Sequence, residues 1–232
     1  GIMTLIFGGL FYFRDSKINY PLINFKMFKI KTFTFGNIAV MTSYMCMFTN
    51  GILLPLFLQE IVKYNAFLTG LLILPYSIAS SAVAPFAGSY AGKNGSRGLT
   101  IAGPCIYILA LVIFTTFNPS TPMWEIVLAS VIMGIGNGCF QSPSNNAIIT
   151  CVNKDELGIA SGILSLSRNL GNILGVAVTI TLFDSFRNLL IEEGTKYQTA
   201  FLTSYHWTMC FGIAFGLTCL ICSAIAYTPE KS

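Results

Sequence analysis

The chain has 232 residues, of which 54% are hydrophobic and 9% are charged, and its formal net charge is +4. A water-soluble protein of this size would have to expose large apolar patches to accommodate such a composition, which excludes a soluble globular class. The charge-free segments are long and continuous, whereas a barrel strand needs about 10 residues of alternating polarity, so we predict a helical membrane protein.

Six segments are long enough to cross about 30 Å of hydrocarbon, which takes roughly 20 residues at 1.5 Å per residue. In chain order, we expect helices at about 33–59, 66–91, 98–117, 124–150, 157–185 and 205–228. Residues 1–13 are uncharged and predict the end of a truncated helix, 14–32 a cytoplasmic basic loop, and 229–232 a cytoplasmic tail. The predicted fold class is an all-α polytopic membrane protein with six complete transmembrane helices and the end of a seventh.

Basic residues gather in the loops on one side of the predicted helices. That side has nine, namely Arg14, Lys17, Lys26, Lys29, Lys31, Lys93, Arg97, Lys154 and Lys231. The other side has Lys63, Arg187 and Lys196, and Arg168 lies within a span. The positive-inside rule makes the richer side cytoplasmic, so we expect a multi-pass protein of the cytoplasmic (cell) membrane with a cytoplasmic C-terminus. Topology thus explains the positive charge, and we expect no nucleic-acid partner.

The second and third helices are joined by the glycine-rich, basic stretch "GSYAGKNGSRG" at 88–98. A phosphate-binding Walker loop is excluded, because only three residues separate Gly88 from Gly92 and because Asn94, not a hydroxyl residue, follows Lys93. A tight solvated turn remains open as an interpretation, with permissive glycine backbone and basic side chains among lipid headgroups.

The fourth predicted helix carries three amides on one face. Asn137, Gln141 and Asn145 recur at i, i+4 and i+8. Pro143 removes a backbone donor and frees the carbonyl of Cys139, so we expect it to kink the helix. These amides either line a substrate pathway or make structural hydrogen bonds, and the sequence leaves both roles open.

The fifth predicted helix has a single small and polar face. Its members are Gly158, Ser161, Ser165, Arg168, Asn172, Gly175 and Thr179, spaced by three or four residues. A helix-packing seam would explain the glycines and serines. It would not explain Arg168, which lies about 15 Å inside the helix, where an arginine costs about 2.5 to 3.5 kcal/mol to insert. Gln141 lies at a matching depth, and we predict a substrate pathway formed by Arg168, Gln141, Asn137, Asn145, Asn172 and Ser165.

Catalytic and metal-binding constellations are missing from the predicted spans, so we expect no enzyme activity, no cofactor and no metal site. The acidic residues all lie in loops or toward span ends, and none supplies a titratable group at the midplane. The pair Cys219 and Cys222 has no second pair or histidine nearby and is interpreted as packing.

Several stretches resemble a known family. Gly88, Lys93, Gly95 and Arg97 fit the cytoplasmic loop motif of the major facilitator superfamily, with Gly92 in place of its aspartate. The stretches "PLINFKMFKIKTFTFGN", "GILLPLFLQ", "GIGNGCFQSPSNNAI" and "GIASGILSLSRNLGNILGVAV" resemble its fourteen-helix drug:proton antiporter (multidrug efflux) branch. The resemblance implies that residues 33–228 are the C-terminal six-helix bundle of such a transporter. Its implied partner is an N-terminal six-helix bundle of the same full-length chain.

This resemblance implies transport by alternating access, with efflux of hydrophobic or cationic compounds in exchange for protons. A facilitator of another small solute is the alternative, and a membrane scaffold is less favoured because it would not explain Arg168. Bundles of this type contain two three-helix units of opposite topology. Accordingly, "TGLLILPYS" in the second helix is echoed by "SGILSLSRN" in the fifth, and "NGILLP" in the first by "NGCFQSP" in the fourth.

Overall fold

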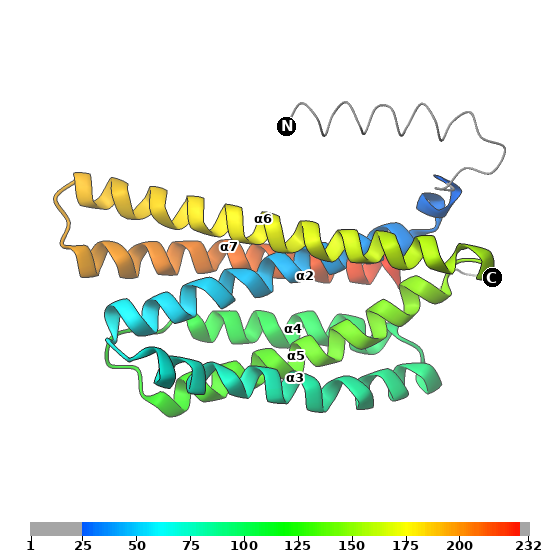
Figure 1. Ribbon diagram of the computed structural model, residues 1–232, viewed down its shortest axis with the longest axis horizontal. Coiled ribbons are helices and arrows are strands. Elements are labelled where there is room, and N and C mark those ends of the chain that lie inside the picture. The colour runs from blue at the N-terminus through cyan, green and yellow to red at the C-terminus, as the bar shows by residue number, and fades with distance from the viewer. Residues whose placement is uncertain (1–24, 228–232) are drawn as a thin grey trace.

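The computed structural model describes residues 25–227, in which six helices are long and apolar enough to cross a membrane (Figure 1). In chain order, the elements are the 3-10 helix η1 (Phe25–Lys29), α2 (Lys31–Leu56), the π-helix η2 (Phe57–Ile61), α3 (Ala66–Asn94), α4 (Arg97–Phe114), α5 (Met123–Thr150), the 3-10 helix η3 (Lys154–Glu156), α6 (Leu157–Glu192) and α7 (Tyr197–Ala226). No strand occurs within 25–227, so the predicted all-α polytopic fold is confirmed. The expected helix end at 1–13, the loop portion 14–24 and the tail at 229–232 lie outside these residues.

Two helix ends differ clearly from the prediction. The last helix begins at Tyr197 rather than at 205, because its first turns are held by aromatic packing. Phe201 lies 5.0 Å from Phe183 of α6, and Tyr205 lies 5.1 Å from Phe57 of η2, between ring centroids. The fifth predicted helix continues to residue 192 rather than ending at 185. At about 54 Å it is longer than the hydrocarbon layer, so part of it extends beyond that layer.

The six helices pack as two intertwined groups of three. The first helix of each group packs mainly on the other group, α2 on α6 and α7, and α5 on α3 and α4. In Figure 1 the turns α3–α4 and α5–α6 lie at one end, together with the end of α7. We call this the basic end, since Lys93, Arg97 and Lys154 lie there. The turns α2–α3, α4–α5 and α6–α7 form the opposite end.

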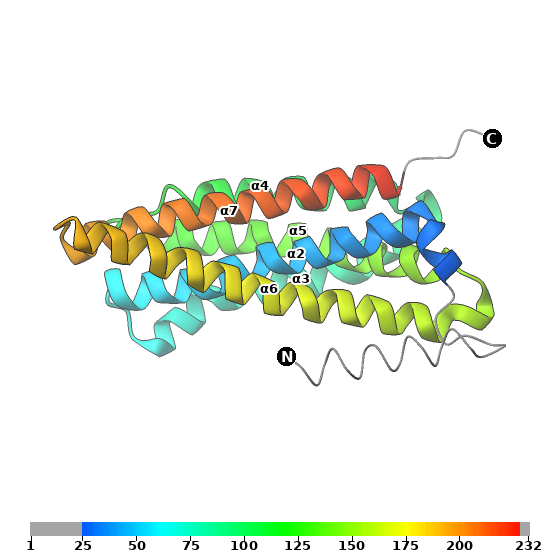
Figure 2. The same ribbon diagram turned by 90° about the horizontal axis from the view of Figure 1, so that it is seen from above.

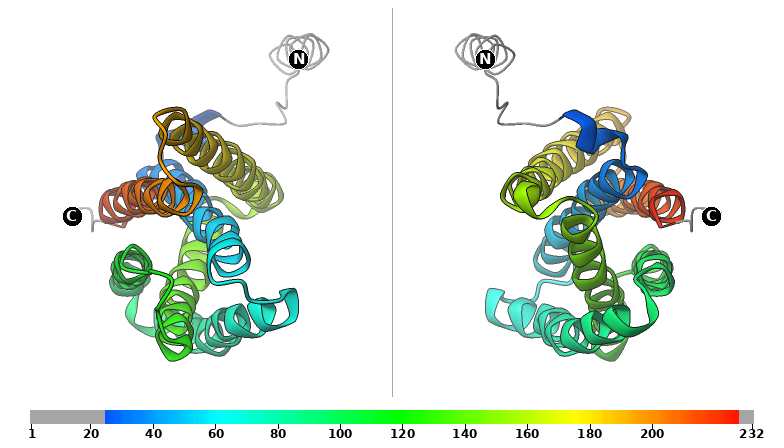
Figure 3. Two further views of the ribbon diagram at one scale, coloured as in Figure 1. Left: turned by 90° about the vertical axis from the view of Figure 1, so that its left-hand side faces the viewer. Right: turned by 90° about the vertical axis from the view of Figure 1, so that its right-hand side faces the viewer.

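The two sides of the bundle are covered differently. The helices α4 and α7 pack against each other and close one side. On the other side α3 and α6 are not packed together, and α2 and α5 lie between them, as the crossing of α2 and α6 in Figure 2 and the end views of Figure 3 show. We call this the α3–α6 side. Its two flanking helices are also the least buried of the six.

Glycines on α5 allow α3 and α4 to approach it from two directions. A Cβ on Gly134 would collide with the carbonyl oxygen of Tyr76 in α3. A Cβ on Gly136 would lie 2.7 Å from the backbone nitrogen of Tyr107 in α4, and one on Gly103 of α4 would lie 2.8 Å from the carbonyl oxygen of Gly136. The string "GIGNG" therefore sets the distances between three helices, as small residues do at close helix contacts in membranes.

Candidate functional site

The glycine-rich basic stretch forms the end of α3 and the turn to α4. Gly88 lies inside α3, not in a loop, and a Cβ there would be 2.6 Å from the hydroxyl oxygen of Ser142 in α5. Lys93 lies in the last turn of α3, and Gly95 ends the helix with φ of +86°, a conformation that suits glycine. Arg97 begins α4, and both basic side chains are exposed. The geometry is that of a tight basic turn with a helix-packing glycine before it.

The three predicted amides on α5 fall into two kinds. The side-chain nitrogen of Asn137 donates a hydrogen bond of 2.9 Å to the hydroxyl oxygen of Ser80, which ties α5 to α3. The Oε1 of Gln141 and the Oδ1 of Asn145 are buried and have no hydrogen-bond partner in the described part of the chain. Pro143 is buried within α5, which continues past it to Thr150. Asn137 thus makes a structural hydrogen bond, whereas Gln141 and Asn145 each have an acceptor oxygen without a partner in the described chain.

The predicted face of α6 is not uniformly covered. Ser161 and Ser165 are exposed, and each donates a hydrogen bond of 2.9 Å to a carbonyl of its own helix. Gly158 is also exposed and meets no atom that a Cβ would touch. Within the described chain the basic end of this face is therefore exposed, because α2 crosses α6 and covers only part of it (Figure 2).

The covered part of α6 packs on α2 through small residues. A Cβ on Gly171 would collide with the carbonyl oxygen of Met41, and one on Gly175 would lie 2.8 Å from the Cα of Met45. Farther along, the hydroxyls of Thr179 and Thr49 form a buried hydrogen bond of 2.9 Å. Gly171 was not on the predicted face, so the packing seam is shifted toward it.

Arg168 and Asn172 lie on α6 at the edge of the part that α2 covers. Both side chains are half-buried, and the Nε of Arg168 and the Oδ1 of Asn172 are buried atoms without a hydrogen-bond partner among the described residues. No ion pair of Arg168 is found among them either. Arg168 follows Leu157, the start of α6, by about 16 Å. The guanidinium of Arg168 therefore lies about half the thickness of a hydrocarbon layer along α6, with no hydrogen-bond or ion-pair partner in the described chain.

Arg168 and Gln141 are the two members of the predicted pathway that we expect at a matching depth. The two residues lie at similar distances from the α5–α6 turn, but no hydrogen bond joins them in the described structure. The two helices separate beyond their turn, since α5 packs mainly on α3 and α4, and α6 on α2 and α7 (Figure 1). No hydrogen bond joins the α5 amides to Arg168 or Asn172 in the described structure, so their place in one pathway stays a prediction.

A cavity of about 310 Å³ between α2, α3 and α5 was not predicted from the sequence. Its lining includes Asn50, Ser130, Met133 and Tyr76. The Oδ1 of Asn50 and the hydroxyl of Ser130 are buried there without a partner in the described range. The available signal was the Asn-Gly pair of "NGILLP", which repeats the pair that contains Asn137.

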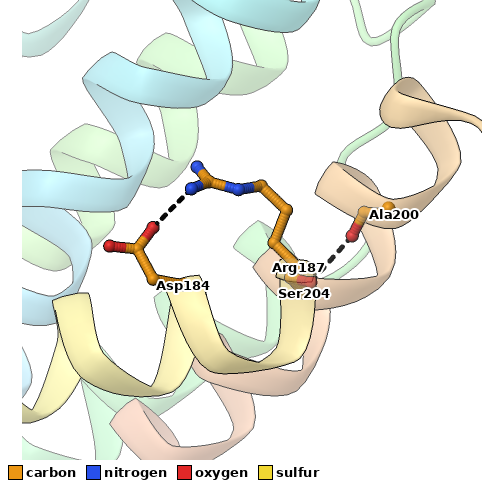
Figure 4. Close-up of polar contacts among 4 residues, drawn as sticks. All are labelled: Asp184, Arg187, Ala200 and Ser204. Carbon is orange, nitrogen blue, oxygen red and sulfur yellow. Dashed lines mark hydrogen bonds and ion pairs between the residues drawn. The ribbon is translucent and has the colours of Figure 1, made fainter. Parts of the chain in front are cut away.

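The opposite end carries the two ion pairs found among the described residues. The guanidinium of Arg187 lies 2.8 Å from a carboxylate oxygen of Asp184 one turn earlier on α6 (Figure 4). The same guanidinium lies 5.3 Å from the centroid of the Phe183 ring. Lys63 and Glu60 form a longer, exposed pair of 3.8 Å. The charges balance within each pair, and the Asp184–Arg187 pair helps α6 to continue past the predicted end of its span.

Comparison with known proteins gives a consistent set of matches. The sequence profile of the family described as "Major Facilitator Superfamily" matches residues 36–232. The chain is 28% identical over 199 residues to the riboflavin transporter RibZ of Clostridioides difficile (strain 630), a match covering 86% of this chain and 43% of that protein. It is 27% identical over 231 residues to the lincomycin resistance protein LmrB of Listeria monocytogenes, covering 96% and 49%.

A further relative is the multidrug resistance protein Stp of Mycobacterium tuberculosis, 26% identical over 183 residues, with 79% of this chain and 34% of that protein covered. The chain thus spans about half the length, or less, of the curated relatives it matches.

Proposed function

Because the chain belongs to the major facilitator superfamily, whose members are membrane transporters and not enzymes, we propose that it forms the C-terminal bundle of a proton-coupled exporter. The full transporter exports hydrophobic or cationic compounds from the cytosol by alternating access, in the cell membrane and with its basic end in the cytoplasm. Relatives named for lincomycin and multidrug resistance support export. The relative named as a riboflavin transporter supports the alternative, transport of another small solute.

The observation that carries this proposal is a set of buried polar atoms on α5 and α6 that have no hydrogen-bond partner in the described chain. Eight buried side-chain atoms in the described range lack a hydrogen-bond partner, and four of them belong to Gln141, Asn145, Arg168 and Asn172. Leaving a polar atom buried and unpaired costs free energy, so proteins usually satisfy such groups. Polar groups at membrane depth mark substrate and ion pathways. We infer that water or substrate in a transport path supplies the missing partners.

The α3–α6 side is where this path is proposed to run. Its helices α2 and α5 are not covered there by the other four, whereas α4 and α7 close the far side. In transporters of this family the substrate site lies at the interface of the two six-helix bundles. The N-terminal six-helix bundle of the full-length chain is proposed to cover this side, with Arg168 and Asn172 on one flank and the α5 amides on the other.

Proton coupling requires a titratable group in the transport path, and the four residues Gln141, Asn145, Arg168 and Asn172 include no carboxylate and no histidine. The described acidic residues lie in turns or near helix ends, such as Glu125 in the first turn of α5 and Asp184 toward the end of α6. The coupling carboxylate is therefore proposed to lie in the N-terminal bundle.

The test is transport by the full-length protein in inside-out membrane vesicles. We expect ethidium, a hydrophobic cation, to accumulate when the vesicle interior is made acidic, and to leave when the proton gradient is collapsed. Riboflavin serves as the second solute in the same vesicles. Transport of riboflavin without ethidium would favour the alternative, and movement of either solute that ignores the gradient would refute proton antiport.

A further inference from the structure

We propose that the cavity between α2, α3 and α5 binds a neutral aromatic group that carries an O–H or N–H donor. The proposal rests on the transport function above and narrows the substrate class. A substrate is held here by an uncharged, flat part of its structure and by one hydrogen bond that it donates.

The cavity has an open mouth and a buried polar floor. Gly51 and Ser77 are exposed at its rim, whereas Asn50, Ser130 and Met133 are buried. Its volume of about 310 Å³ falls at the lower end of the range for small-molecule sites. A compact ring system therefore fits, and a large multi-ring compound would leave part of itself outside.

The buried side chain of Asn50 favours a ligand that carries a hydrogen-bond donor. The side-chain nitrogen of Asn50 donates to the sulfur of Met133 over 3.2 Å, and the reverse amide orientation would face an oxygen acceptor to a sulfur acceptor. Asn50 is only 8% exposed, yet its Oδ1 has no partner in the described chain, and neither has the hydroxyl of Ser130 in the same cavity. A ligand hydroxyl or amine can complete the acceptor, and water can do so while the cavity is empty.

The side chains that line the cavity favour a neutral, aromatic ligand. No charged side chain lines this cavity, so nothing there balances a cation. The thioethers of Met47 and Met133 and the ring of Tyr76 offer polarisable and aromatic surface. The hydroxyl of Tyr76 is already used, because it donates to the sulfur of Met47 over 2.8 Å. A lipid acyl chain would match the walls but would leave the Asn50 acceptor unpaired.

Asn37 on the same helix provides a matched control. It is 6% exposed, and both of its amide atoms are satisfied. Its nitrogen donates to the Phe33 carbonyl over 2.8 Å, and its oxygen accepts from Ser167 over 3.0 Å. Replacing Asn37 should therefore weaken the fold, whereas replacing Asn50 should remove an acceptor that only a ligand or water uses.

The experiment compares 2-naphthol with 2-methoxynaphthalene, which lacks the donor, on the purified full-length transporter in detergent. Both are neutral at pH 7, because a phenolic hydroxyl ionises only near about pH 10 and the methyl ether has no ionisable proton. Equilibrium dialysis with tritiated probes, corrected for empty micelles, should show about tenfold tighter binding of 2-naphthol. The preference should disappear in Asn50→Leu and persist in Asn37→Leu.

Equal binding of the two probes to the wild-type protein would overturn the proposal, and this comparison needs no variant that has to fold. A preference that survives Asn50→Leu would also overturn it. The proposal would also be overturned if added phospholipid displaced both probes to the same extent, because the cavity would then be a lipid groove. Because equilibrium binding needs no proton gradient, failure here is distinguishable from failure of ethidium export.

Discussion

Replacing Arg168 with alanine should separate its effect on membrane insertion from its effect on transport. An arginine at the centre of a membrane helix costs about 2.5 to 3.5 kcal/mol on insertion scales. Arg168 lies at about that depth, is half-buried, and has no hydrogen bond or ion pair in the described structure that would be lost. Arg168→Ala should therefore hold or raise the amount of inserted full-length protein, while substrate flux falls.

Thr179→Val is the matched control on the same helix. It removes the hydrogen bond of 2.9 Å to Thr49, at a cost of about 1 kcal/mol, and should leave flux per inserted molecule unchanged. Arg168→Lys keeps the charge but loses the planar guanidinium, so it should recover part of the flux.

The assay for these variants is the initial rate of ethidium accumulation in inside-out vesicles, divided by the amount of inserted protein. Wild-type flux in Arg168→Ala would refute a role in transport. Degradation of that variant before insertion would instead identify Arg168 as a structural residue.

Three further outcomes are expected. With native cysteines removed, a cysteine at Asp155 should react with impermeant thiol reagents only when the cytoplasmic face is open, and one at Glu193 from outside; the reverse pattern would invert the proposed topology. Vesicles containing only these 232 residues should show no proton-driven flux, because the proposed path needs the second bundle, and measurable flux would contradict this. Gly136→Val should destabilise the purified protein by about 1–3 kcal/mol, because its side chain would collide with the Tyr107 backbone. Gly158→Val should not, because Gly158 faces open space. Equal melting temperatures would refute the packing argument.

The charge-free runs were sufficient to predict six spanning helices, because the hydrocarbon layer fixes the length that each must have. They were not sufficient for the end of α6. Asp184 and Arg187 interrupt the apolar run, but they pair within the helix and let it continue. The last charge-free run begins at Tyr197 and so already contained the start of α7, whereas the prediction began the helix at 205. The extra residues are helical because Phe201 packs on Phe183 across the α6–α7 pair.

The candidate site was predictable only in part. Spacing placed Asn137 and Gln141 on one face of α5, but it could not show that Ser80 of another helix satisfies the first and leaves the second free. The same limit applies to α6, where the crossing with α2 decides that Gly171 is covered and Gly158 is not. Asn50 was visible as part of a repeat, but its buried acceptor follows from three helices meeting around one cavity.

The central claim is that Gln141, Asn145, Arg168 and Asn172 face a water-accessible transport path. Its most direct measurement is the reaction of single cysteines at these four positions with a permeant and an impermeant methanethiosulfonate reagent, in the full-length transporter without native cysteines. We expect all four to react with the impermeant reagent from at least one side of the membrane, and to react more slowly when ethidium is present. A cysteine at Ile173, an exposed neighbour outside this polar set, should not react with it. Equal inertness of the four positions and Ile173 would contradict the account.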